Sequence, residues 1–296
     1  MNKPAQKVAE LYYFELLPLH PQPQPLESLT SYLSRLAISN GFISFAALSE
    51  LVFPAQHQAS LYRFKDCPPL SLGKLPLITS HPATILLPTT FYHLARKFGR
   101  SVATAQVTHF LDGSLAQHLR FCPRCLQDYN CYFLTWRFKA LRGCAEHGCH
   151  LLEQCGQCGQ EIPLLTNPLS IGVCPGCKKA LKSVVSPALS KRRREASLRQ
   201  QRDLAYLLTP EPMEADEVAP QVVKQLGRDL RQRRLSRSQS IREVAKALKL
   251  PSAQIVFIEQ GRLKQGTASF RAYQIYANYF DLTLFDLFAM VRAELV

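Results

Sequence analysis

Four short stretches decide the central region of this chain: CPRC at residues 122–125, CAEH at 144–147, CGQC at 155–158 and CPGC at 174–177. Each stretch places two metal-ligand side chains three positions apart, so that one tight turn can direct both at a single ion. The chain between paired stretches is long enough to return and complete a tetrahedron. The predicted ligands are Cys122, Cys125, Cys144 and His147 in the first site and Cys155, Cys158, Cys174 and Cys177 in the second.

Both predicted sites have four ligands, which is the pattern of structural Zn²⁺, and we expect two zinc ions per chain. Cys149 and His150 are alternatives to His147, which is preferred because it repeats the two-residue spacing of the other pairs. A zinc hydrolase or nuclease would need an open coordination position or a nearby general base, and neither is evident. The sequence also lacks a phosphate-binding loop. We therefore expect a protein that is not an enzyme.

The chain has 296 residues, a net charge of +14 and ten cysteines. Such a charge favours an anionic partner, and we expect nucleic acid. The first residues contain no apolar signal region, and no stretch has the length and hydrophobicity of a membrane span. We expect a cytoplasmic protein without a membrane partner, in which the cysteines bind metal instead of forming disulfides.

The patterns predict a mainly α protein in four parts. Residues 1–117 form an N-terminal helical domain with a helix-turn-helix character, and 118–183 carry tandem zinc-finger or zinc-ribbon modules. Residues 184–220 form a basic and then acidic linker, and 221–296 form a second helical domain. In the first part, an apolar face at 29–37 predicts a helix that ends at Asn40-Gly41, and Ser44 can cap the next helix. Further helices are expected near 90–98 and 101–111.

The segment from Pro25 to Ala37, PLESLTSYLSRLA, followed by Asn40-Gly41, resembles the opening motif of the TniQ family. The order of the later motifs is also similar: a cysteine pair, Trp136, a Cys-His pair and two further cysteine pairs. This resemblance covers about residues 14–183. It implies a non-catalytic target-site selector of a transposon, which links a target-bound complex to an AAA+ regulator of the TnsC type. In the TniQ family, TnsD-type members read DNA directly, and shorter members sit on a CRISPR effector complex with its guide RNA.

The region 221–296 resembles five-helix Xre/Cro-type helix-turn-helix domains. Ser240 and Glu243 form a capping box for its second helix, and residues 252–260 predict the third helix, which enters the DNA major groove in such domains. The resemblance implies that Glu259 is a structural acid, with Arg231 on the first helix as its expected partner. The loop at 235–239 looks about three residues longer than usual.

The outward positions of this third helix are poor in groups that read bases. Val256 and Phe257 stand where polar residues are usual, while Ser252 and Gln254 remain as candidate readers. This composition favours docking on a protein, although the basic flank still favours DNA phosphate. The candidate contact residues are Arg231, Arg234, Arg237, Ser252, Gln254, Val256, Phe257, Arg262 and Lys264, together with Lys191, Arg192, Arg193 and Arg194 in the basic segment.

The leading hypothesis is therefore a zinc-containing adaptor for transposon insertion that joins a CRISPR effector complex to the AAA+ regulator. A TnsD-like reader of a fixed DNA site is the closest alternative. A stand-alone helix-turn-helix transcriptional regulator is an alternative of another class, but it leaves the TniQ-like half unexplained. A homodimer is compatible with each hypothesis.

Overall fold

The computed structural model describes residues 16–54, 66, 72–210, 219–263 and 268–295. Within these residues the chain is mainly helical, as predicted, and the strands are limited to the two-residue β1 (Gly143–Cys144) and β2 (Cys149–His150). No helix in the described part of the chain has the length and hydrophobicity needed to cross a membrane. Contacts group the chain into two compact units, each built from separated segments.

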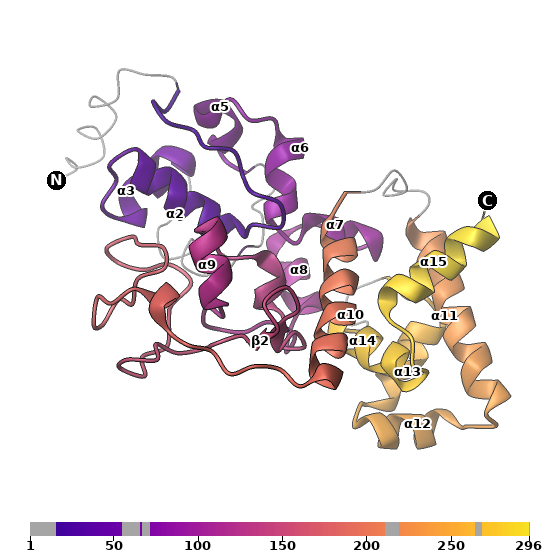
Figure 1. Cartoon of the computed structure of the whole chain (residues 1–296). Coiled ribbons are helices and arrows are strands. Elements are labelled where there is room, and N and C mark those ends of the chain that lie inside the picture. The colour runs from indigo at the N-terminus through magenta and orange to yellow at the C-terminus, as the bar shows by residue number, and fades with distance from the viewer. Residues whose placement is uncertain (1–15, 55–65, 67–71, 211–218, 264–267, 296) are drawn as a thin grey trace. The chain divides into compact units, whose positions relative to one another are not determined.

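The first unit comprises Met1–Thr90, Gln117–Arg137 and Cys149–Ala188. Its helical elements are α2 (Leu29–Ser39), α3 (Phe45–Val52), α5 (Leu75–Thr79), α6 (Ala83–Leu86), η1 (Leu87–Thr89), α9 (Pro123–Tyr129), η2 (Leu134–Arg137) and η3 (Leu181–Ser183), and α2 and α3 lie side by side (Figure 1). The predicted apolar face of α2 is fully buried in the core of this unit. Gly41, at φ +75°, follows the helix as expected, and Ser44 accepts a hydrogen bond from the Ala47 N–H to cap α3.

The second unit comprises Phe91–Ala116, Phe138–Gly148 and Leu189–Val296. Its helices are α7 (Tyr92–Lys97), α8 (Thr104–Phe110), α10 (Lys191–Leu208), α11 (Ala219–Ser236), α12 (Ile241–Leu248), α13 (Ser252–Glu259), α14 (Phe270–Tyr279) and α15 (Leu284–Leu295). Phe98 is the centre of an aromatic core, with ring centroids at 5.2 Å from Phe110, 5.9 Å from Phe270, 5.0 Å from Tyr273 and 5.3 Å from Phe288. The helices predicted near 90–111 therefore share a core with α14 and α15.

Helix α10 occupies about half of residues 184–220, the predicted linker. Ser190 caps this 18-residue helix by accepting a hydrogen bond from the Arg193 N–H. Leu204, Leu207 and Leu208 are buried in the C-terminal half of the helix. The first turns consist mostly of charged residues, so the sequence there has no apolar period that would predict a helix. The two units are defined by contacts between residues. The division into four domains at residues 117, 183 and 220 stays a prediction.

Candidate metal centres and binding surfaces

The four cysteines of the second cluster converge as predicted. The ligand atoms of Cys155, Cys158, Cys174 and Cys177 all lie within 4.8 Å of one another. The Sγ atoms of Cys155 and Cys177 are 3.7 Å apart, and those of Cys158 and Cys174 are 3.6 Å apart. A tetrahedral site with Zn–S bonds of about 2.3 Å requires sulfur separations of about 3.8 Å. The donor set and its spacing therefore fit Zn²⁺.

Two matching turns form this second cluster. The Gly159 N–H donates to the Cys155 carbonyl at 2.8 Å, and the Lys178 N–H donates to the Cys174 carbonyl at 3.0 Å. Gly159 and Lys178 both have positive φ, at +72° and +61°. Each turn is closed by the N–H of the fourth residue after its first cysteine. The second cysteine, at the third position, lies inside the turn and faces the same point as the first.

Backbone groups also prepare one of these thiols to bind metal. Burial opposes ionisation of Cys155, but hydrogen bonds from the backbone of Gln157 and Cys158 and from neighbouring thiols lower its pKa to about 7. Burial, together with the neighbouring thiols, raises the pKa of Cys174 to about 11. A cation would supply the charge that stabilises all four thiolates, because metal binding displaces the thiol protons.

The first cluster brings together Cys122, Cys125, Cys144 and His147, whose ligand atoms also lie within 4.8 Å of one another. Cys122 is the N-cap residue of α9, and Cys125 is buried on that helix. The His147 Nδ1 atom lies 3.6 Å from the Cys144 Sγ atom, and the His147 N–H donates to the same sulfur at 3.4 Å. Three sulfurs and one imidazole nitrogen are a recognised set of ligands for structural zinc.

The two alternatives to His147 lie close by but outside this four-residue group. Cys149 is buried, and its Sγ atom is 3.5 Å from that of Cys122. The backbone of His150 is bound to the segment before α10, through its N–H to Pro187 and through its carbonyl to the Ser186 hydroxyl. The geometry is therefore compatible with the predicted ligand set and adds a fifth sulfur at its edge.

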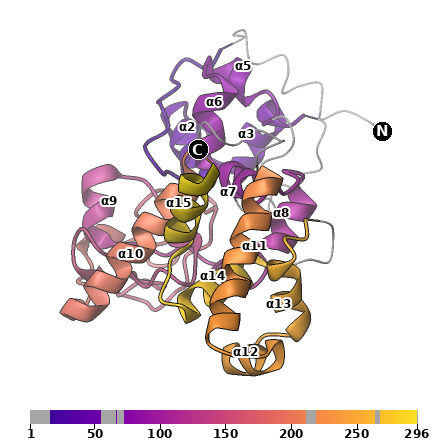
Figure 2. The ribbon, with the colours of Figure 1, turned by 90° about the vertical axis from the view of Figure 1, so that its right-hand side faces the viewer.

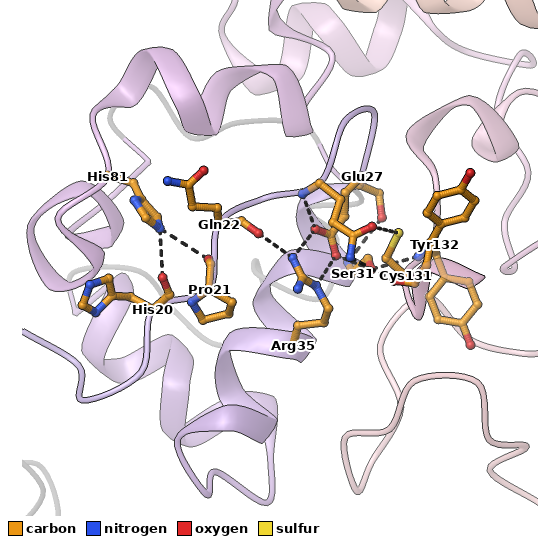
Figure 3. A network of polar contacts seen from close by, with 12 residues as sticks. His20, Pro21, Gln22, Glu27, Ser31, Arg35, His81, Cys131 and Tyr132 are labelled. Atoms are coloured by element: carbon orange, nitrogen blue, oxygen red, sulfur yellow. Dashed lines mark hydrogen bonds and ion pairs between the residues drawn. The ribbon is translucent and has the colours of Figure 1, made fainter. Parts of the chain in front are cut away.

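A buried polar network is formed by the segment 25–37 (Figure 3). Glu27 is fully buried and accepts hydrogen bonds from Ser31 Oγ at 2.8 Å, Arg35 Nε at 2.8 Å and Arg35 Nη2 at 2.7 Å. Burial opposes the charge on Arg35, but its hydrogen bonds to Glu27 produce a net rise in its pKa. Glu27, just before α2, and Ser31 and Arg35 on it thus form one polar cluster with spacing i, i+4 and i+8.

This network attaches α2 to the segment that follows α9. The Tyr132 N–H donates to Ser31 Oγ at 2.9 Å (Figure 3). The Ser28 N–H donates to the Tyr132 carbonyl at 2.9 Å. Burial, followed by the nearby Glu27 carboxylate, raises the pKa of Cys131 to about 12, so this cysteine remains a neutral thiol. Glu27 and Arg35 bond to each other within the motif, whereas the contact of Ser31 with Tyr132 joins residues far apart in sequence.

In the C-terminal region, the prediction that Arg231 is the partner of Glu259 is wrong. Arg234, and not Arg231, donates to Glu259, from Nε at 2.6 Å and from Nη2 at 2.8 Å, and the Tyr276 hydroxyl donates to the same carboxylate at 2.7 Å. Arg234 lies one helical turn further along α11, which continues to Ser236, so residues 237–240 connect α11 to α12. The capping box of Ser240 and Glu243 is confirmed.

Helix α13 packs against α11 and α12 (Figure 2). Arg231 is exposed and lines a pocket of about 160 Å³ beside α13. Its lining residues are Arg231, Arg234, Ile241, Val256, Glu259 and Gln260. Val256 and Phe257 are half-buried, and the Arg262 guanidinium carbon lies 5.3 Å from the centroid of the Phe257 ring. The helix that resembles a DNA reader therefore presents apolar groups bordered by arginine.

The remaining candidate contact residues differ in exposure and in their partners within the protein. Gln254 accepts a hydrogen bond from the Ser269 N–H at 2.9 Å, so its carbonyl oxygen already has a partner inside the domain. Ser252 is exposed, and the Arg237 guanidinium carbon lies 4.8 Å from the Phe280 ring centroid. Lys191, Arg192, Arg193 and Arg194 lie in the first turn of α10 and are exposed. Lys264 lies outside the described residues.

Residues 18–151 match the TniQ family model, and this range includes the opening motif and the whole first cluster. The match ends before the second cluster and before the five C-terminal helices. No curated protein matches the chain. Residues 18–151 therefore form a TniQ family domain. Proteins of the TniQ family are generally non-catalytic transposition proteins.

Proposed function

We propose that this chain is a non-catalytic adaptor that selects the target site in a transposition system. The TniQ domain at residues 18–151 is the observation that carries this proposal. The two four-ligand clusters support it, because closed tetrahedral sites serve structure and leave no position for a reacting water. In this proposal each cluster holds one Zn²⁺, and the adaptor joins a CRISPR effector complex to an AAA+ regulator of the TnsC type.

The C-terminal domain supplies a docking surface in this proposal. Gln254 is bound to Ser269, which removes one hydrogen-bonding group from the set available to bases. The half-buried Val256 and Phe257 present apolar surface beside a pocket, and such side chains are typical anchors of protein interfaces. These features favour contact with a protein over base reading by α13.

The alternative is a TnsD-like selector that reads target DNA directly. The net charge of +14 and the exposed Arg231 and Arg262 near α13 favour this alternative, because cations contact DNA phosphates. The two functions differ in whether the chain alone protects a specific DNA sequence. They also differ in the role of Phe257, which is an interface anchor only in the adaptor.

A paired assay tests the adaptor proposal. The full chain is used to capture a purified AAA+ regulator and a guide-RNA effector complex, and a footprint is recorded on bare target DNA. Phe257→Ala is expected to weaken capture by about 2 kcal/mol and to leave weak, salt-sensitive DNA binding unchanged. Ser252→Ala, on the same helix, is the matched control and should not affect capture. A discrete footprint without partners, together with unchanged capture by Phe257→Ala, would favour the TnsD-like selector.

A further inference from the structure

One member of the basic segment contacts the first metal cluster instead of facing solvent alone. The knuckle is defined here as residues 143–148, which carry Cys144 and His147. Arg194 Nε donates to the Ala145 carbonyl at 3.1 Å, and Arg194 Nη2 donates to the Glu146 carbonyl at 3.5 Å. One planar guanidinium therefore binds two successive carbonyls of the knuckle, a geometry that suits the fixed fork of arginine donors.

Residues near Arg194 in the chain also contact both ends of the knuckle, Gly143 and Gly148. The Leu189 N–H donates to the Gly148 carbonyl at 2.7 Å. A Cβ atom at Gly143 would lie 2.4 Å from Leu189 Cδ1 and 2.8 Å from Ser197 Oγ, so the absence of a side chain permits this approach. A Cβ atom at Gly148 would lie 3.5 Å from Arg194 Nε. The start of α10 is thus packed closely against the metal-binding turn.

The peptide between Glu146 and His147 connects Arg194 to a metal ligand. Its carbonyl oxygen accepts from Arg194, and its N–H belongs to His147 and donates to Cys144 Sγ at 3.4 Å. In a trans peptide the carbonyl and the N–H point in opposite directions. Holding the oxygen therefore also fixes the direction of the N–H toward the sulfur. Hydrogen bonds of this kind orient metal ligands and stabilise their charged form.

We propose that Arg194 is a positioning residue for the first metal site. It orients the peptide that donates to Cys144 Sγ and thereby strengthens metal binding by the cluster of Cys122, Cys125, Cys144 and His147. The inference rests on the proposed zinc sites. It separates Arg194 from Lys191, Arg192 and Arg193, which share its helical turn and have no comparable bond to the knuckle among the described contacts.

The test measures zinc affinity at both clusters of the full chain by competition with a coloured chelator, for the wild type and for Arg194→Ala, Arg194→Lys and Arg192→Ala. Arg194→Ala should weaken the first site about 10- to 100-fold and leave the second site unchanged, so the second site is an internal control. Arg194→Lys keeps the charge but loses the planar fork, and its effect should be intermediate. Arg192→Ala should behave as the wild type.

Co²⁺ substitution identifies which site is affected, because a site with three thiolates and one imidazole has a different visible spectrum from a four-thiolate site. The expected loss is confined to the spectrum of the mixed site. Equal affinity of both sites in Arg194→Ala and wild type would overturn the inference, as would an equal loss in Arg192→Ala. If Arg194→Ala does not fold, the same comparison with Arg194→Lys decides. A wild-type chain that binds no zinc would instead refute the metal sites themselves.

Discussion

The two metal clusters differ in how the surrounding chain supports them. The second cluster consists of two matching turns within residues 155–179, and one of its cysteines, Cys158, is exposed. The first cluster has a helix N-terminus at one pair of ligands and a knuckle bound by Arg194 at the other. The second cluster is therefore organised mostly by local hydrogen bonds, whereas the first depends on residues far away in sequence. The ligands of the two clusters have similar spacing in sequence, but different parts of the chain hold the two clusters in place.

Removal of one ligand should reveal the largest difference between the clusters. Cys144→Ser and Cys174→Ser are each expected to release one of two zinc ions, measured by elemental analysis. Structural zinc contributes on the order of 10 kcal/mol to folding of small domains, so both changes should lower the free energy of unfolding. The loss should be greater for Cys144→Ser, because its knuckle also packs against α10. Equal losses in chemical denaturation would remove the proposed difference between the clusters.

Two ion pairs of the first unit differ in burial and should therefore differ in their contribution to stability. Arg35→Ala leaves the fully buried Glu27 carboxylate without its partner, and breaking a buried pair costs about 3–5 kcal/mol. His118, which precedes Cys122 of the first cluster, and Glu161, which follows Cys158 of the second, form a pair at 3.2 Å with side chains 42% and 53% exposed. His118→Ala should therefore change stability by less than about 1 kcal/mol. Urea denaturation of both variants measures the difference, and similar values would contradict it.

Glycine substitutions probe how closely each metal-binding turn is packed. Gly143→Ala places a methyl group against Leu189 and Ser197 and should cost about 1–3 kcal/mol through overpacking. A Cβ atom at Gly159 of the second cluster meets nothing within 4 Å, so Gly159→Ala adds only the strain of its positive φ, about 1 kcal/mol. Thermal unfolding compares the two variants. Only Gly143→Ala should also weaken the first metal site.

The smallest expected effect concerns the C-terminal half of α10. Burial raises the pKa of Asp203 to about 7, although the carboxylate accepts the Phe285 N–H at 2.6 Å. Its folded pKa is above its unfolded value of about 3.9, so the folded state binds more protons and stability falls as pH rises between these values. Relative to Asp203→Asn, the wild type should lose about 1 kcal/mol between about pH 6 and 8. A stability difference that is independent of pH would contradict this assignment.

The sequence alone determined the features that depend on neighbours along the chain. Pairs of ligands with two intervening residues predicted both metal clusters, because a single turn brings such pairs together. The apolar period of α2 and the capping residues Ser44 and Ser240 also predicted local structure correctly. In each case the interacting groups are within a few positions of one another, so spacing and residue type are sufficient.

Only the tertiary structure decided the roles that depend on distant partners. The resemblance to Xre/Cro-type domains gave Arg231 as the partner of Glu259, but the packed structure shows that Arg234 reaches it. The bond between Gln254 and Ser269, and that between Arg194 and the knuckle, likewise join residues from separate elements. A charged or polar side chain has the same appearance in sequence whether it faces solvent or a buried carbonyl. Its partner is fixed only when the folded chain brings the two groups within hydrogen-bonding distance.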